Sequence, residues 1–177
     1  MLFRSPTPRC LDLGTGSGCL LLAFLSEIDA AEGIGLDLDA GAIDIARANA
    51  KSLGLADRAL FQVEDFTKNL DKLGQFSVVL ANPPYIPVSE IADLAPDVRL
   101  FDPLLALDGG DDGLFVWRRL IPQIARVLAP DGTAFVEIGK GQEQEVSLIA
   151  LASGLECVAQ FDDLAGVTRC LQFAIKI

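Results

Sequence analysis

The chain has 177 residues, of which 51% are hydrophobic and 22% charged, and this composition is typical of one globular domain with its own core. Its net charge of −11 argues against a nucleic-acid surface, because phosphate neutralisation needs basic side chains. The sequence contains no histidine, which excludes Ser-His-Asp and Cys-His catalysis and zinc sites that need imidazole. Arg118 and Arg119 leave a local basic patch open, although adjacent arginines also fit a solvated helix face.

The cysteines and apolar runs indicate the compartment. The four cysteines are not spaced as metal ligands, and Cys10 and Cys170 fall in apolar runs typical of buried strands. No apolar run reaches the ~18 residues that a membrane span needs, and the first residues lack the apolar core of a signal peptide. These features predict a cytoplasmic protein with reduced thiols, and we expect a monomer without a bound metal ion.

The hydrophobic pattern predicts strands and helices that alternate along the chain. Strands are expected at residues 9–13, 33–36, 59–63, 76–81, 132–138, 155–161 and 169–175. Helices are expected at residues 19–26, 40–53, 113–128 and 142–153. This alternation is typical of βαβ units and of a mostly parallel sheet with helices on both faces. The short connection 162–168 favours an antiparallel hairpin at the edge of the sheet.

Residues 85–112 interrupt this alternation with three prolines and a scatter of acidic residues. Long irregular segments in compact domains are usually functional or disordered. We interpret this segment as a wall or lid over a site, with a short helix near residues 89–94. A mobile acidic loop is the alternative for most of its residues.

Asn82, Pro83, Pro84 and Tyr85 directly follow the predicted strand 76–81. The carboxyl end of a strand is where open α/β sheets place their ligands. The Asn82 side chain offers a carbonyl oxygen, the rigid prolines hold backbone carbonyls that can accept, and Tyr85 offers a flat aromatic face. This combination suits a planar substrate that carries an NH2 group, and it contains neither an acid nor a base.

A glycine-rich turn, Asp12-Leu13-Gly14-Thr15-Gly16-Ser17-Gly18, joins the first strand to the first helix. Glycine lets a backbone turn tightly and approach a ligand, as dinucleotide and S-adenosylmethionine sites require. The third glycine of the dinucleotide pattern would fall at Cys19, which argues against that cofactor; a plain tight turn is the structural alternative. Asp37 can accept from both ribose hydroxyls, and Asp65 and Phe66 offer an acceptor and an apolar face for adenine.

Four segments carry a family resemblance. They are the glycine-rich turn, Asn82-Pro83-Pro84-Tyr85-Ile86, Asp108-Gly109-Gly110-Asp111-Asp112-Gly113-Leu114 and Glu137-Ile138-Gly139. Together they resemble the HemK-type enzymes, class I S-adenosylmethionine-dependent methyltransferases that modify the side-chain amide nitrogen (N5) of a glutamine in peptide chain release factors. The Asn-Pro-Pro-Tyr motif alone is shared with adenine-N6 and guanine-N2 methyltransferases of DNA and RNA, so the other segments favour the glutamine branch. The resemblance implies a Rossmann-like α/β sandwich with a seven-stranded sheet and an antiparallel last strand.

The resemblance also assigns roles to residues and names a partner, the release factor. The residues implied to bind the cofactor are Asp12, Gly14, Thr15, Gly16, Ser17, Gly18, Asp37, Asp65, Phe66 and Asn82. The residues implied to grip the substrate glutamine are Asn82, Pro83, Pro84 and Tyr85, and those implied to act in catalysis are Asn82, Pro83 and Tyr85. As a hypothesis, the amide N–H groups donate to the Asn82 side chain and the Pro83 carbonyl, so positioning rather than a strong base supports the reaction.

The resemblance covers the chain from about residue 8 to its end. Residues 1–8 are interpreted as a leader or truncation scar, and residues 9–177 as the catalytic domain. The family carries an N-terminal helical domain that docks the release factor, whereas this chain begins almost at its first strand. Asp102-Pro103 stands where the family commonly has Glu-Pro. A DNA or RNA methyltransferase and a truncated cofactor-binding remnant without activity are the alternatives, and a dinucleotide oxidoreductase ranks below them.

Overall fold

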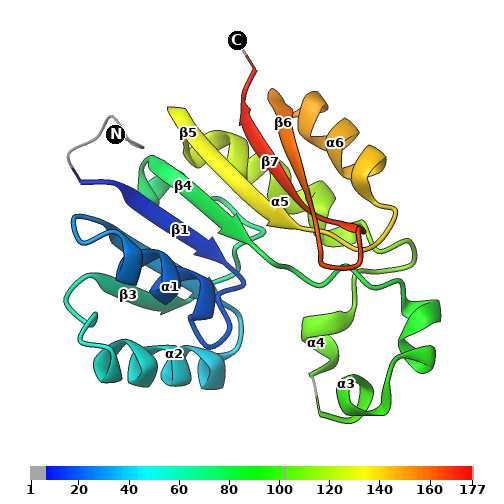
Figure 1. Ribbon diagram of the computed structural model, residues 1–177, viewed down its shortest axis with the longest axis horizontal. Coiled ribbons are helices and arrows are strands. Elements are labelled where there is room, and N and C mark those ends of the chain that lie inside the picture. Colours follow the sequence, from blue (N-terminus) through cyan, green and yellow to red (C-terminus); the bar gives the residue numbers. More distant parts are fainter. Residues whose placement is uncertain (1–6, 102, 177) are drawn as a thin grey trace.

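A seven-stranded sheet forms the centre of the protein, in the order β3-β2-β1-β4-β5-β7-β6 (Figure 1). The computed structural model describes residues 7–101 and 103–176, so the first six residues of the expected leader and Asp102 lie outside it. The strands are β1 (Arg9–Leu13), β2 (Glu32–Asp37), β3 (Ala59–Val63), β4 (Phe76–Ala81), β5 (Leu128–Glu137), β6 (Leu155–Asp162) and β7 (Thr168–Ile175).

The pairing of the strands confirms the predicted topology. β1 lies between β2 and β4 and pairs in parallel with both, while β3 and β5 continue the parallel ladder on either side. β7 runs antiparallel to both of its neighbours, β5 and β6, as the predicted hairpin requires. The carboxyl ends of β1, β2, β4 and β5 therefore meet at one edge of the sheet, where the segments that follow them can build a site.

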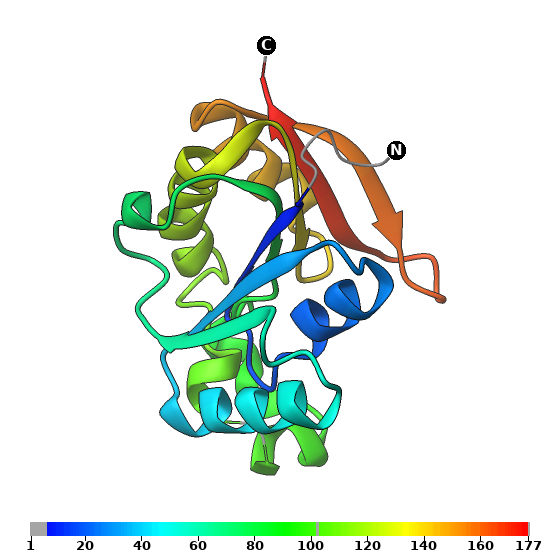
Figure 2. The same ribbon diagram turned by 90° about the vertical axis from the view of Figure 1, so that its left-hand side faces the viewer.

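Helices cover both faces of the sheet, each over its own apolar core (Figures 1 and 2). They are α1 (Cys19–Glu27), α2 (Ala40–Ser52), α3 (Pro96–Phe101), α4 (Leu104–Leu107), α5 (Phe115–Val127) and α6 (Glu143–Ala152), with 3-10 turns η1 (Asp71–Leu73) and η2 (Val88–Asp93). α1 and α2 pack with Cys10 and Phe61 on one face. On the other face α5 buries Trp117, Leu120, Ile124 and Val127, which follow one another at intervals of three or four residues, the spacing of one helical stripe.

Strand β5 begins earlier than the sequence predicts. The sequence predicts a start at residue 132, whereas the strand begins at Leu128 and contains an irregularity, because Phe76 pairs with Leu128 whereas Val78 already pairs with Thr133. A bulge of this kind lets one strand carry extra residues without ending the ladder. The predicted start of this strand at residue 132 is therefore wrong, because residues 128–131 are built into the strand through the irregularity.

The segment between β4 and α5 stands clear of the sheet, beyond the carboxyl ends of β1 and β4 (Figure 1). The sequence predicts one short helix there, and the structure has three, namely η2, α3 and α4. The segment is tied back at Ile86, whose N–H donates to the Leu107 carbonyl at 3.1 Å and whose carbonyl accepts from the Gly109 N–H at 2.8 Å. These bonds return the chain to the edge of the sheet just before α5 begins.

Within the described chain, no helix lies over the face of β5 and β7 that is opposite to α5 and α6, whereas on β4 the same face packs against α1 through Val78 (Figure 1). Phe135 of β5 and Phe161 of β6 meet on this face, with ring centroids 6.3 Å apart. Cys170 pairs with Phe161 across the β6–β7 ladder and is half-buried, so the expectation that this residue is buried is wrong, whereas Cys10 is buried as expected. The reason is that its strand face has no helical cover in the described residues.

Candidate functional site

The glycine-rich turn after β1 folds over the end of β2. The backbone N–H groups of Gly14 and Thr15 both donate to the Leu36 carbonyl, each at 2.9 Å. Gly16 has a φ of 54°, in the left-handed region, and nothing lies within 4 Å of the position that a Cβ would take there. The turn therefore presents bare backbone to open space, as close approach of a ligand requires.

Asp12 lies buried beneath this turn. Its side chain is 1% exposed, its Oδ2 accepts from the Thr15 hydroxyl at 2.7 Å, and its Oδ1 has no hydrogen-bond partner in the described structure. Burial raises the pKa of Asp12 to about 6 and the nearby Asp37 charge adds to the rise, while the Thr15 hydroxyl opposes it. The backbone N–H of Leu21 also favours the charged form of Asp12 and so lowers its pKa. It does not form a hydrogen bond with Asp12 Oδ1 in the described structure. One buried acceptor is thus available to a ligand.

Asp37 joins the carboxyl ends of β1 and β2. Its Oδ2 accepts from the Gly16 N–H at 2.8 Å, and its Oδ1 accepts from the Asp39 N–H at 2.9 Å. Asn49 of α2 supports the same turn, because its Nδ2 donates to the Ser17 carbonyl at 2.9 Å. Asp37 is half-buried, and each of its oxygens keeps a further lone pair, so it can still accept from a ligand hydroxyl.

Asp65 and Phe66 follow β3, and only the ring of Phe66 packs against the turn. Phe66 is 6% exposed, and its Cζ lies 3.5 Å from the position of a Cβ on Gly14. The Asp65 carboxylate accepts from the Thr67 hydroxyl at 2.7 Å and pairs with Lys68 at 3.0 Å. The hydrogen bond from Thr67 holds the pKa of Asp65 below its usual value. The acceptors of Asp65 are therefore already partly used.

Asn82 begins the loop after β4, at the same edge of the sheet. Its backbone oxygen lies 3.7 Å from the position of a Cβ on Gly14, so the ends of β1 and β4 adjoin. Its side chain is exposed and makes no hydrogen bond with any residue that the structure describes. Pro83 is buried and Pro84 is half-buried, which anchors the backbone that carries this amide. Asn82 thus has an unpaired side-chain amide, and its backbone adjoins the glycine-rich turn.

Tyr85 is held by its hydroxyl at the end of β5. The hydroxyl donates to Glu137 Oε1 at 3.0 Å. Burial raises the pKa of Tyr85 to about 12, and the charge and hydrogen bond of Glu137 add to the rise. At neutral pH the phenol is therefore protonated and serves as a donor and an aromatic surface rather than as a base.

Gln142, at the start of α6, is a residue of this site that the sequence patterns do not reveal. Its Oε1 accepts from the Gly139 N–H at 2.9 Å, and its Nε2 donates to the carbonyls of Tyr85 at 3.0 Å and Gly113 at 3.3 Å. One side chain therefore connects the three segments that follow β4, precede α5 and follow β5. The signal that could have found it is an amide three residues after the glycine of Glu137-Ile138-Gly139.

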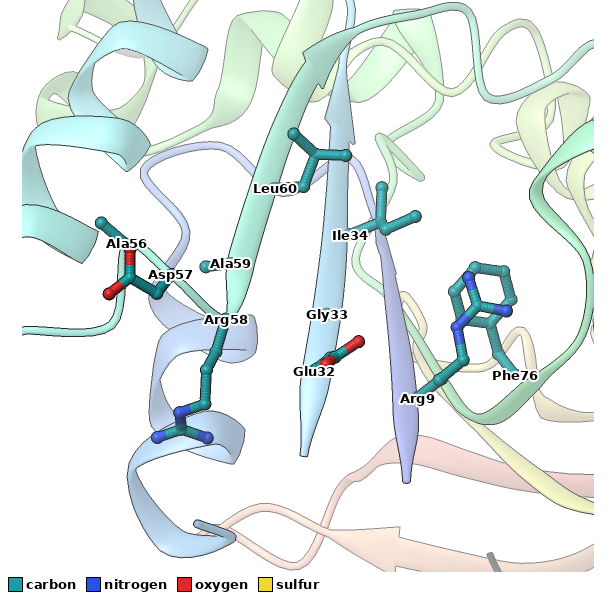
Figure 3. A pocket seen from close by; sticks show the side chains of 10 residues that line it. All are labelled: Arg9, Glu32, Gly33, Ile34, Ala56, Asp57, Arg58, Ala59, Leu60 and Phe76. Atoms are coloured by element: carbon teal, nitrogen blue, oxygen red, sulfur yellow. The ribbon is translucent and has the colours of Figure 1, made fainter. Parts of the chain in front are cut away.

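Two hollows in the surface lie away from this edge. One of about 350 Å³ opens at the amino ends of β1, β2 and β3, where the Arg9 guanidinium lies 4.5 Å from the centroid of the Phe76 ring (Figure 3). The other, of about 450 Å³, lies between α6 and β6. Neither is lined by a residue of the predicted site, so the chemistry of the carboxyl edge and not the size of a hollow identifies the site.

The structure gathers the glycine-rich turn, Asp37, Phe66, Asn82 and Tyr85 at the carboxyl edge, and it turns Asp65 toward its own loop. Among residues 7–101 and 103–176, no three acidic or sulfur-bearing side chains lie close enough together to hold a metal ion. In the same residues, no helix has the length and apolar character needed to cross a membrane.

Known proteins are similar to this chain along most of its length. A release factor glutamine methyltransferase from Rhodospirillum rubrum is 47% identical over 163 residues, which are 92% of this chain and 50% of that protein. The protein of the same name from Bradyrhizobium diazoefficiens is 46% identical over 165 residues, which are 93% of this chain and 55% of that protein. The chain therefore spans about half the length of the curated relatives that it matches.

Solved structures share the fold at lower identity. A ribosomal protein L11 methylase from Lactobacillus delbrueckii subsp. bulgaricus has a TM-score of 0.70 at 19% identity, over 99% of this chain and 73% of that one. TrmN from Thermus thermophilus has a TM-score of 0.70 at 21% identity, over 96% of this chain and 44% of that one. The Rossmann-like methyltransferase fold is thus confirmed. Because the family profile described as methyltransferase domain matches residues 5–155, the chain belongs to the methyltransferase domain family.

Proposed function

We propose that this protein transfers a methyl group from S-adenosylmethionine to the side-chain amide nitrogen (N5) of a glutamine in a peptide chain release factor. The observation that carries the proposal is the unpaired side-chain amide of Asn82, a residue whose backbone adjoins Gly14 of the Asp12–Gly18 turn. Family membership supports the reaction class, and the name of the 47% identical relative supports the substrate. Residues 9–177 act in this proposal as the catalytic domain, a monomer in the compartment where release factors work, the cytoplasm.

The residues around the turn fit S-adenosylmethionine. Asp12 Oδ1 is a buried acceptor without a partner, which suits an ammonium group, and the Asp37 oxygens keep lone pairs for ribose hydroxyls. Gly16 leaves open space for the methionine part, with Gly14, Thr15, Ser17 and Gly18 completing the cradle. Phe66 offers an apolar surface for adenine, while Asp65 has only part of its acceptor capacity left. When bound, the cofactor supplies an electrophilic methyl group on sulfur, and the products are its thioether, the methylated amide and a proton.

The substrate amide is a poor nucleophile, because its nitrogen lone pair is delocalised into the carbonyl group. Asn82 Oδ1 and the Pro83 carbonyl can accept its two N–H groups and so fix the direction of the nitrogen. Tyr85 supplies the flat surface against which the amide plane packs. Because the pKa of Tyr85 is about 12, this residue does not remove the proton at neutral pH. Catalysis in this proposal comes from positioning and exclusion of competing geometries rather than from a strong base.

The charge of the chain supports a protein substrate. A net charge of −11 opposes binding to the phosphate backbone of DNA or RNA, whose affinity depends on basic side chains. A direct experiment therefore distinguishes the two hypotheses, methylation of a release factor glutamine and methylation of DNA or RNA. The protein is incubated with labelled S-adenosylmethionine and, in separate reactions, a release factor, duplex DNA and ribosomal RNA. We expect label on the release factor, and label on DNA or RNA alone would overturn the proposal.

Asn82→Ala tests the residue that carries the proposal. We expect this variant to lose methyl transfer while its affinity for S-adenosylmethionine, measured by calorimetry, stays within a few-fold of the unmodified protein. Asn69→Ala is the matched control, because Asn69 is an exposed asparagine outside the predicted site whose Oδ1 accepts from the Asp71 N–H. Weaker cofactor binding with normal turnover at saturation in Asn82→Ala would contradict the assigned role.

A further inference from the structure

The side chain of Gln142 uses both ends of its amide on backbone groups. Its Oε1 accepts from the Gly139 N–H at 2.9 Å. Its Nε2 donates to the Tyr85 carbonyl at 3.0 Å and to the Gly113 carbonyl at 3.3 Å. An amide is the neutral side chain that can accept on one side and donate twice on the other, so these three bonds define both its type and its orientation.

The backbone around Gln142 leaves almost no free space. A Cβ on Gly113 would lie 2.5 Å from the Tyr85 oxygen and 2.6 Å from Gln142 Nε2. A Cβ on Gly139 would lie 3.0 Å from Gln142 Cδ and 3.1 Å from Tyr85 Cδ2, and one on Gly109 would lie 2.7 Å from the Tyr85 carbonyl carbon. At Gly109 and Gly113 a Cβ would overlap the Tyr85 backbone, and at Gly139 it would press on Gln142 and Tyr85, so a small movement of Gln142 is transmitted to Tyr85.

The end of strand β5 fixes Tyr85 at a second point, its hydroxyl group. Its hydroxyl donates to Glu137 Oε1 at 3.0 Å, and the following residue, Ile86, bonds to Leu107 and Gly109 through its backbone. On the other side, β4 holds the chain up to Ala81. Between these anchors Pro83 and Pro84 restrict the backbone torsions, so the position of Tyr85 sets the direction in which the Pro83 carbonyl and the Asn82 amide point.

We infer that Gln142 is a positioning residue for the proposed substrate-binding loop, Asn82–Tyr85. It acts by holding the Tyr85 carbonyl and does not itself touch the substrate. The inference rests on the proposed function for the identity of the bound substrate, a glutamine amide. It rests on the three hydrogen bonds of Gln142 for the way in which the Asn82–Tyr85 loop is held in place. It assigns a common task to the segments Asp108–Leu114 and Glu137–Gly139, which is to fix the loop that contains Asn82.

Two substitutions separate positioning from simple support of the fold. Gln142→Glu keeps an acceptor for the Gly139 N–H and removes the donor, so it places a carboxylate oxygen against the Tyr85 and Gly113 carbonyls. Gln142→Met keeps the length and removes all three bonds. If positioning of Tyr85 matters, both variants lose roughly 10- to 100-fold in kcat at saturating substrate, because small displacements of reacting groups cost that much. Their affinity for S-adenosylmethionine stays within two-fold, since Gln142 contacts no part of the Asp12–Gly18 turn.

Matched controls are the same changes at Gln144, an exposed residue of α6 two positions further along. Gln144→Glu adds the same charge and Gln144→Met the same apolar group, and we expect both to keep wild-type kcat. If Gln142→Glu turns over at the wild-type rate, or if cofactor affinity falls in parallel with kcat, the positioning role is overturned.

A second readout does not depend on activity. Tyr85 is the single tyrosine of the chain, so labelling with fluorotyrosine gives one fluorine NMR signal for this ring. We expect the Gln142 variants to shift or broaden that signal and the Gln144 variants to leave it unchanged. An unchanged signal in the Gln142 variants would overturn the inference even if the protein methylates glutamine. If the wild-type protein methylates no release factor, the proposed function fails separately, and the fluorine signal still decides whether Gln142 holds Tyr85.

Discussion

Replacing the buried Asp12 with Asn should change how the stability of the protein depends on pH. Asp12 is 1% exposed beneath the glycine-rich turn, and one of its oxygens has no hydrogen-bond partner in the described structure. Burial raises its pKa from 3.8 to about 6, so the folded chain binds the proton more tightly than the unfolded chain. The stabilisation that this proton provides is complete below about pH 4 and is lost as the pH rises through about 6. Asn cannot ionise, and the Asp12→Asn variant therefore lacks this loss.

The size of the effect follows from the shift in pKa. A rise from 3.8 to about 6 is a change of about two units, and each unit corresponds to about 1.4 kcal/mol, so ionisation of Asp12 costs about 3 kcal/mol of stability by pH 7. The free energy of unfolding of Asp12→Asn, minus that of the wild-type protein, should therefore increase by about 3 kcal/mol between pH 4 and pH 7. Taking this difference cancels the contributions of the exposed carboxylates, which are the same in both proteins.

Urea unfolding, followed by the fluorescence of the single tryptophan, Trp117, measures this difference at several pH values. Trp117 is fully buried in the core under α5, so its emission reports global unfolding. A difference that stays constant between pH 4 and pH 7 would refute the reasoning, because it would mean that Asp12 ionises in the folded chain as easily as in water. Asp12→Asn should also bind S-adenosylmethionine more weakly, which calorimetry at pH 7 would detect.

Three further substitutions test other parts of the site. Gly113→Ala introduces a Cβ 2.5 Å from the Tyr85 oxygen at a φ of 72°, so urea unfolding should show a loss of at least ~1 kcal/mol, and an unchanged midpoint would contradict the tight packing. Tyr85→Phe removes the hydrogen bond to Glu137 and should cost about 1 kcal/mol in thermal unfolding while most turnover remains. A loss of kcat as complete as in Asn82→Ala would instead mean that the hydroxyl takes part in the reaction. Asp37→Asn should weaken S-adenosylmethionine binding roughly 10-fold by calorimetry, and unchanged affinity would remove Asp37 from the cofactor site.

The parts of the fold that follow from local sequence could be predicted well. β1, β3 and β4 have the predicted bounds, because each is a short apolar run between turn residues, and the antiparallel hairpin of β6 and β7 followed from a short connection. The glycine-rich turn and the loop at Asn82 lie at the same edge because parallel strands place their carboxyl ends together.

The parts that depend on distant contacts could not be predicted. Gln142 lies 57 residues from Tyr85, and its role appears only when β5 brings the start of α6 beside the loop after β4. The orientation of Asp65 depends on the competing donors Thr67 and Lys68, which periodicity does not rank. The exposure of Cys170 depends on which strand faces lack a helix, and this is a property of the whole sheet rather than of the strand.

The central claim is that the Asn82 loop grips a glutamine amide for methylation, and mapping the modified atom tests it most directly. A release factor is incubated with the protein and S-adenosylmethionine, digested, and sequenced by tandem mass spectrometry, with Asn82→Ala as the control. The account predicts one added methyl group on the side-chain nitrogen of a single glutamine, absent with Asn82→Ala. A methyl group on another residue type, or equal methylation by the Asn82→Ala variant, would contradict it.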